Sequence, residues 1–272
     1  MLFFVYDVIY AINIFIKYSM QTKRFLIFPL MVICLGLALF ASLTTIFLSI
    51  SRIKKVSSNV NLSTESFTIY ILEIASSNVE SEAAQMGRDS MINNNAGYVW
   101  KNDKFYVISS CYLNENDAVL MKKKRAKDDL YSGIIKEVFP SVSISSAYSD
   151  KEKEVLLKAL GSFYDTFEKL FDISVSLDGK HLNETSAILK INEIESNINA
   201  IESNFETLFD GGDTHFLKTI NTSLKELEKT IDLLSKKSYV SPLQTLSSAI
   251  KYRYSETLHI YKELLGSLIE EK

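Results

Sequence analysis

The chain has 272 residues, of which 47% are hydrophobic and 23% charged, and its formal net charge is −3. This composition is ordinary for a folded protein with one large domain or two small ones. Only nine Gly and three Pro occur. Their scarcity excludes collagen-like segments, proline-rich spacers and glycine-rich phosphate loops, and it favours long helices.

The small net charge is an average over two unlike regions. Residues 1–55 contain six basic side chains and one acidic one, a balance of +5, so the rest of the chain carries −8. An acidic region of this kind is unsuited to non-specific binding of nucleic acid. We therefore expect no nucleic-acid partner.

The basic residues flank an uncharged apolar segment over residues 25–50. A helix of this length exceeds the ~30 Å hydrocarbon core of a bilayer, which predicts a transmembrane signal anchor over residues 20–52. A buried core helix would keep a polar face, and a cleaved signal peptide would have a shorter apolar stretch. Three basic residues lie on each side of the segment, so charge alone does not give its orientation.

Residues 1–19 are also apolar, but Asp7, Asn13 and Lys17 interrupt them. They are either a short second span or interfacial helix, or a mis-assigned start. Met20 supports the second interpretation, because it precedes a short basic run and then the apolar segment, the usual layout of a signal anchor. The polar residues 53–65 predict a tether.

The sequence offers little that is typical of catalysis or metal binding. Cys34 falls in the predicted span and Cys111 in a predicted strand, so the two cannot form a disulfide. The three histidines stand alone, without a second ligand at metal-binding spacing. No nucleophile-elbow, zinc-protease or phosphate-loop motif occurs. We expect no catalytic residue, no metal site and no cofactor, and hence no enzyme.

Residues 66–143 predict a small α/β module. Runs of β-branched and aromatic residues predict strands, and Asn114 is a suitable N-cap for a following helix. The expected order is strand, helix, hairpin, helix and strand, which ferredoxin-like topologies share. The predicted elements are a strand at 67–74, a helix within 77–95, a hairpin of 98–100 with 105–108, a helix at 115–128 and a strand near 134–139.

Two segments of this module, FTIYILEIASSNVESEA and FYVISSCYLNENDA, resemble the half-repeats of the SPOR (sporulation-related repeat) domain family. That family repeats an aromatic-x-Val-x-Val strand, a Ser-rich turn and a Glu/Ala-rich helix. The resemblance implies a bacterial, single-span membrane protein with residues 56–272 outside the cytoplasm. It also implies binding of peptidoglycan glycan strands during division or sporulation, in a groove on the sheet face away from the helices.

Strand alternation places Ile69 and Ile71 on the face that two helices can cover, which leaves the other face open. Aromatic rings with a polar edge suit a sugar surface. The alternative is that another part of the chain covers this face. The expected glycan-binding residues are Tyr70, Leu72, Ile74, Trp100, Tyr106, Ile108 and Tyr112.

Apolar residues recur at steps of three and four through residues 150–272, which predicts an antiparallel four-helix bundle. Four stripes carry this pattern, beginning at Leu156, Ala187, Leu217 and Leu243. They form the bundle core or, alternatively, a seam for self-association or a protein partner. The expected fold class is a membrane-anchored α+β protein, with a small ferredoxin-like SPOR-type module followed by this bundle.

Two functions remain open from the sequence. The first is a cell-envelope protein whose module binds glycan strands. The second is a structural membrane protein whose module and bundle make only protein–protein contacts. The resemblance favours the first function, which we therefore expect. Tyr70 and Leu72 stand where the SPOR family usually has Gln and Gly, which favours the second.

Overall fold

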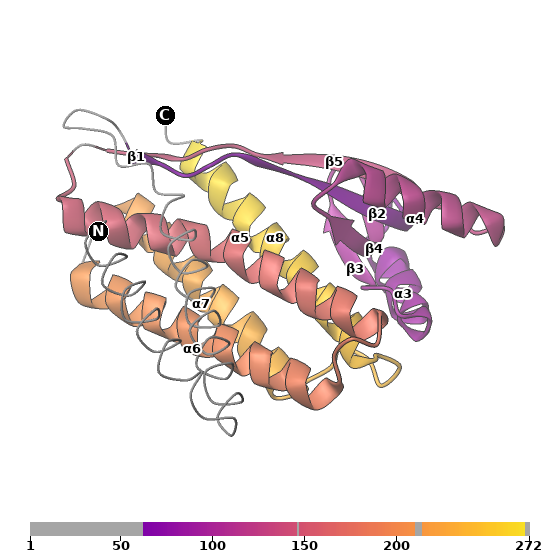
Figure 1. Cartoon of the computed structure of the whole chain (residues 1–272). Coiled ribbons are helices and arrows are strands. Elements are labelled where there is room, and N and C mark those ends of the chain that lie inside the picture. Colours follow the sequence, from indigo (N-terminus) through magenta and orange to yellow (C-terminus); the bar gives the residue numbers. More distant parts are fainter. Residues whose placement is uncertain (1–61, 146, 210–213, 270–272) are drawn as a thin grey trace, which may run out of the picture. The chain divides into compact units, whose positions relative to one another are not determined.

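The computed structural model describes residues 62–145, 147–209 and 214–269 (Figure 1). All of them belong to one compact unit, Val60–Lys272. The hydrophobic core of this unit is continuous and draws its buried residues from positions 69 to 268. The unit therefore holds its own core, and we expect residues 60–272 to fold without the residues before them.

Several sequence predictions lie outside the described residues. These are the apolar segment at 1–19, the anchor at 20–52 and the tether up to residue 61. Within the part of the chain that the structure does describe, no helix combines the length and the apolar character needed to cross a bilayer.

A four-stranded sheet forms the centre of the α/β part, in the order β3-β4-β2-β5 with antiparallel neighbours. β-Branched and aromatic side chains fill the two central strands, as expected of residues that pack on a pleated surface. A separate two-residue ladder joins β1 to β6. The strands are β1 (Leu62–Ser63), β2 (Phe67–Ser77), β3 (Tyr98–Lys101), β4 (Phe105–Tyr112), β5 (Gly133–Phe139) and β6 (Ser143–Ile144).

Two helices, α3 (Glu80–Ser90) and α4 (Glu115–Lys127), link the strands and pack on one side of the sheet (Figure 1). The α4 helix begins where the sequence predicts, because the Asn114 side chain accepts a hydrogen bond of 2.8 Å from the Asn116 amide. The α3 helix continues as a 3₁₀ turn and stops at Asn94, whose φ of 61° is left-handed.

Four long helices follow, each with one apolar stripe turned inward. The first begins with a capping box, in which Ser149 and Glu152 satisfy each other's backbone amides. The last begins at Leu246, later than the pattern predicts, and Leu243 is 48% exposed. The helices are α5 (Asp150–Asp178), α6 (Glu184–Phe209), α7 (His215–Ser235) and α8 (Leu246–Ile269).

Helix α8 connects the two parts of the unit. It contacts β3 and β4 on one side and α5 and α7 on the other, so the sheet lies between α8 and the pair α3 and α4 (Figure 1). Sheet residues and bundle residues belong to a single core, called the shared core below. Aromatic rings join them at one end, where Phe67, Phe139 and Tyr261 stack with centroids 4.6 to 5.9 Å apart.

The predicted fold class, a membrane-anchored ferredoxin-like SPOR-type module followed by a four-helix bundle, is wrong. The described residues form an α+β fold of a four-stranded antiparallel sheet and six α-helices, with no membrane-spanning helix, and the sheet shares one core with α5 to α8. The physical reason is that α8 buries side chains on both of its sides. The sheet and the helices are therefore packed as one body rather than in succession.

Gly97 is the position where the packing of α3 on the sheet depends most on a missing side chain. Its φ is +69°, and a Cβ there would lie 2.5 Å from the Gly87 carbonyl oxygen and 2.7 Å from Met91 Cγ. Gly97→Ala should therefore lower the free energy of unfolding by about 3 kcal/mol, measured by urea denaturation. The control is Gly161→Ala in α5, where no atom lies within 4 Å. It should be neutral or stabilise the unit by up to about 1 kcal/mol. Equal effects of the two substitutions would contradict this explanation.

Candidate functional site

The seven residues expected to bind glycan do not line one surface. Trp100 and Ile108 are 0% exposed and belong to the shared core, on the side that α8 covers. Leu72 is also fully buried, but it lies outside the shared core. Ile74 is half-buried on β2.

Irregular strand pairing explains this division. The register between β2 and β4 shifts on both sides of Glu73, between Leu72 and Glu73 and again between Glu73 and Ala75. Each such bulge exchanges the two faces of a strand. Ile108 consequently joins Ile71 in the shared core, although simple alternation places them on opposite faces. Nothing in the alternation of apolar residues indicates these bulges.

Three tyrosines of the predicted set remain half-buried. Tyr70 and Tyr112 are cross-strand neighbours. The Tyr112 hydroxyl accepts a hydrogen bond of 2.8 Å from Ser110, and burial raises the pKa of Tyr112. Tyr106 lies on the hairpin of β3 and β4, where its hydroxyl donates to Asp103 at 2.8 Å. That hydrogen bond, with smaller contributions, raises the pKa of Tyr106 to about 12.

The surface of α8 that meets the sheet is polar as well as apolar. β3 pairs with β4 only as far as Ile108, so the last residues of β4 have a strand, β2, on one edge only, and α8 supplies further partners. The Cys111 amide donates to the Tyr254 hydroxyl at 3.2 Å, and Cys111 Sγ lies 3.6 Å from Ser255 Oγ. Burial raises the pKa of the Cys111 thiol to about 12. A thiol in this state is neither a nucleophile nor a metal ligand at neutral pH.

A cluster around Asp178 joins α5, α8 and the turn after α3. Lys251 Nζ donates to Asp178 Oδ2 at 2.6 Å and to the Asn94 carbonyl at 3.0 Å. Ser247 and the Asn94 side chain donate to Asp178 Oδ1 at 2.6 and 2.8 Å. Burial of Asp178 opposes its ionisation, but the hydrogen bonds and charge of Lys251 and the bond from Ser247 outweigh it and lower the pKa of Asp178. These hydrogen bonds connect α5 and α8 to the turn after α3, and so connect the long helices to the sheet module.

A second contact joins α8 to the strand β3. The His259 ring lies 5.1 Å from Trp100 and 5.8 Å from Tyr98, and burial lowers the pKa of His259. The ammonium of Lys262 lies 5.2 Å from the centre of the Trp100 ring and donates to Glu137 on β5 at 3.2 Å. Trp100, which was expected to face a ligand, is thus enclosed by side chains of α8.

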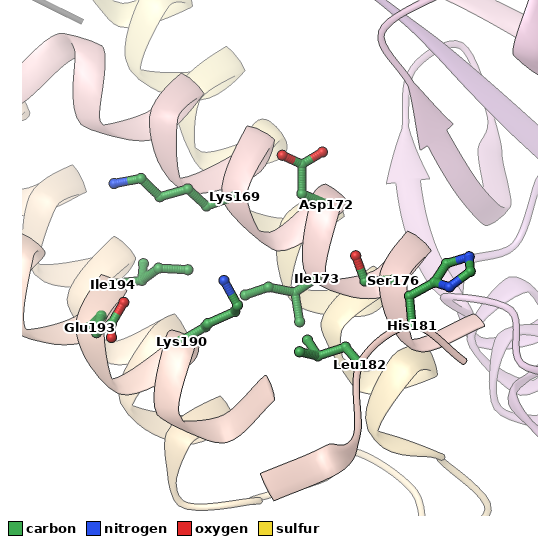
Figure 2. A pocket seen from close by; sticks show the side chains of 9 residues that line it. All are labelled: Lys169, Asp172, Ile173, Ser176, His181, Leu182, Lys190, Glu193 and Ile194. Carbon is green, nitrogen blue, oxygen red and sulfur yellow. The ribbon is translucent and has the colours of Figure 1, made fainter. Parts of the chain in front are cut away.

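A pocket of about 340 Å³ lies between the end of α5 and the start of α6 (Figure 2). Its floor is apolar and its rim carries charges of both signs. Figure 2 shows Asp172, His181 and Lys169 pointing in different directions, without convergence on one point. The lining residues are Lys169, Asp172, Ile173, Ser176, His181, Leu182, Lys190, Glu193 and Ile194.

The side chains that line this pocket do not form a catalytic pair. Such a pair consists of a nucleophile or acid that is hydrogen-bonded to a base, with both groups close to the place where a substrate atom would react. Among the described residues no group of three or more His, Cys, Asp and Glu side chains could hold a metal ion. Cys111, Asp178 and His259, whose pKa values are perturbed, contact the sheet or the turn after α3 and do not line the pocket. No family model, curated protein or solved structure significantly matches this chain.

Proposed function

We propose that this chain is a non-catalytic protein, tethered to a membrane by residues 20–52, whose unit of residues 60–272 acts through protein–protein contacts. The observation that carries the proposal is the closure of the sheet. One side packs on α3 and α4, and the other packs on α8 of the same chain. A ligand groove on the sheet would need the space that α8 fills.

The chemistry of the covered side supports the same interpretation. A glycan groove presents aromatic rings whose faces stack on sugars while their polar edges meet water. Trp100 is enclosed by His259 and Lys262, and Ile108 is fully buried. Tyr70, Tyr106 and Tyr112 are divided between the β2–β4 and β3–β4 pairings, and the hydroxyls of Tyr106 and Tyr112 bind neighbouring side chains. The outward faces of the helices are the surfaces that remain for contacts.

The tether is supported by the 26 uncharged residues at positions 25–50. The full chain should sediment with membranes and resist alkaline carbonate extraction, whereas residues 60–272 alone should stay in the supernatant. Release of the full chain by carbonate would contradict the tether and leave the contact function of the unit to be judged separately.

The contact function is tested against glycan binding with purified peptidoglycan sacculi. Residues 60–272 should stay unbound by intact sacculi and by sacculi whose peptide stems an amidase has removed. Binding that increases after amidase treatment would contradict the proposal. In that event a Tyr70→Ala/Tyr112→Ala variant locates the site, because these cross-strand neighbours keep partial exposure on the sheet.

A further inference from the structure

One exposed surface of the unit combines positive charge with apolar side chains. Lys123, Lys124 and Lys127 on α4 follow Leu120 at steps of three and four, so the four residues lie on one side of the helix, called the lysine face below. All four are exposed, and Leu120 is 64% exposed. Figure 1 shows the C-terminal end of α4 projecting beyond the sheet.

The structure does not use this face for its own packing. Of the residues of α4, all of which are described, only Ala118 is buried. No ion pair links a lysine of the lysine face to another described side chain. Tyr131, which follows in the loop to β5, is 65% exposed. Three lysines and Leu120 are thus exposed on α4 of an otherwise acidic unit, and the exposed Tyr131 donates its hydroxyl to Glu73 at 2.7 Å.

We propose that the lysine face of α4 docks on the anionic phospholipid headgroups of the membrane to which the chain is tethered. Lysine ammonium groups are attracted to anionic lipid, while the exposed Leu120 can enter the boundary between headgroups and acyl chains. The acidic side chains at the two ends of α4, Glu115 and Asp117 in its first turn and Asp128 and Asp129 after it, reduce this attraction but leave the lysine face itself positive.

The length of the chain makes this contact possible. Residues 51–61 separate the apolar segment from the first described strand, and eleven residues reach at most about 40 Å. β2 has 11 residues and carries the chain about 36 Å to the end of the sheet where α4 lies. The unit can therefore lie along a bilayer with the lysine face in contact. This docking rests on the proposed tether, which brings the unit to the membrane.

Vesicle flotation of residues 60–272, which hold their own core, tests the docking without the tether. The unit should float with vesicles of phosphatidylcholine and phosphatidylglycerol in equal parts, and not with phosphatidylcholine alone. Lys123→Gln/Lys124→Gln/Lys127→Gln should weaken partitioning roughly a hundredfold, because each lysine near an anionic surface contributes about 1 kcal/mol. The melting temperature of this triple variant should match that of the unsubstituted unit.

The matched control removes the same charge elsewhere. Lys151→Gln/Lys190→Gln/Lys229→Gln changes three exposed lysines on α5, α6 and α7 and should leave partitioning unchanged. Absence of flotation with the anionic vesicles, or equal losses in the two triple variants, would overturn the docking. Binding to soluble polyphosphate without flotation would overturn it in favour of a polyanion in solution. None of these results alters the carbonate-extraction or sacculus measurements, so failure of the docking is distinguishable from failure of the tether.

Discussion

Replacing Trp100 by alanine should lower the free energy of unfolding of residues 60–272 by about 4 kcal/mol. Trp100 is fully buried between β3 and α8, with the His259 ring 5.1 Å away and the Lys262 ammonium 5.2 Å from the ring centre. Removal of the indole would leave a cavity at the junction of the sheet and the helices. Urea denaturation followed by circular dichroism measures the effect, because the substitution removes the only tryptophan.

Tyr106→Ala is the matched control for Trp100→Ala. Tyr106 is the cross-strand neighbour of Trp100, but it is half-buried and its hydroxyl binds Asp103 in the adjoining turn. Its loss should cost about 1 kcal/mol. Similar small losses for the two variants would mean that the side of the sheet next to α8 is open, and would restore this face as a candidate ligand surface.

Lys251→Ala should destabilise the unit by about 2 kcal/mol. The Lys251 side chain is 11% exposed and Asp178 is 38% exposed, so the loss leaves a carboxylate that is only partly solvated. Breaking a fully buried pair costs more, about 3–5 kcal/mol, and the remaining exposure of Asp178 reduces this value. Lys158→Ala is the control, because the Lys158–Glu154 pair is more than half exposed on both sides and should contribute at most about 0.5 kcal/mol.

A double-mutant cycle with Asp178→Asn should give a coupling energy of about 1–2 kcal/mol. The stability that the Asp178–Lys251 pair contributes should depend on pH in a definite direction. The pKa of Asp178 lies below its ordinary value of 3.8, because the bonds from Lys251 and Ser247 outweigh the effect of burial. The stability from ionised Asp178 is thus fully present above about pH 4 and is lost as the pH falls through the lower folded pKa. The difference in free energy of unfolding between the unsubstituted unit and Lys251→Ala should become smaller as the pH falls through that range. A difference that stays constant would contradict the ion pair.

Much of the local structure could be predicted from the sequence. The β-branched run after residue 66 forms β2, Asn114 caps α4, and the stripes that begin at Leu156, Ala187 and Leu217 lie within α5, α6 and α7. These features depend on neighbouring residues alone, which is why alternation and spacing reveal them. The start of α8 was predicted too early, because the loop before it is held by a hydrogen bond from the Val240 amide to Gln244.

The arrangement of the site could not be predicted, for two physical reasons. The bulges around Glu73 exchange the faces of the strands, and they arise from pairing between distant segments. In addition, Ser248, Lys251 and Ser255 on α8 have the polarity of a solvated helix face, yet all three are buried against the sheet module. They are buried because each has a partner there, such as the Asn95 carbonyl for Ser248. A hydropathy pattern cannot distinguish a polar helix face in solvent from a polar helix face that is buried against hydrogen-bonding partners.

Native-state hydrogen exchange tests the central claim, that the sheet and the four long helices form one cooperative body. The amides of Ile108 on β4 and of Leu258 on α8 are both deep in the shared core. The account predicts that they exchange with the same free energy of opening and respond equally to low concentrations of urea. Exchange of α5 to α8 at a lower free energy, with the sheet still protected, would contradict it and show that the helices can separate from the face they cover.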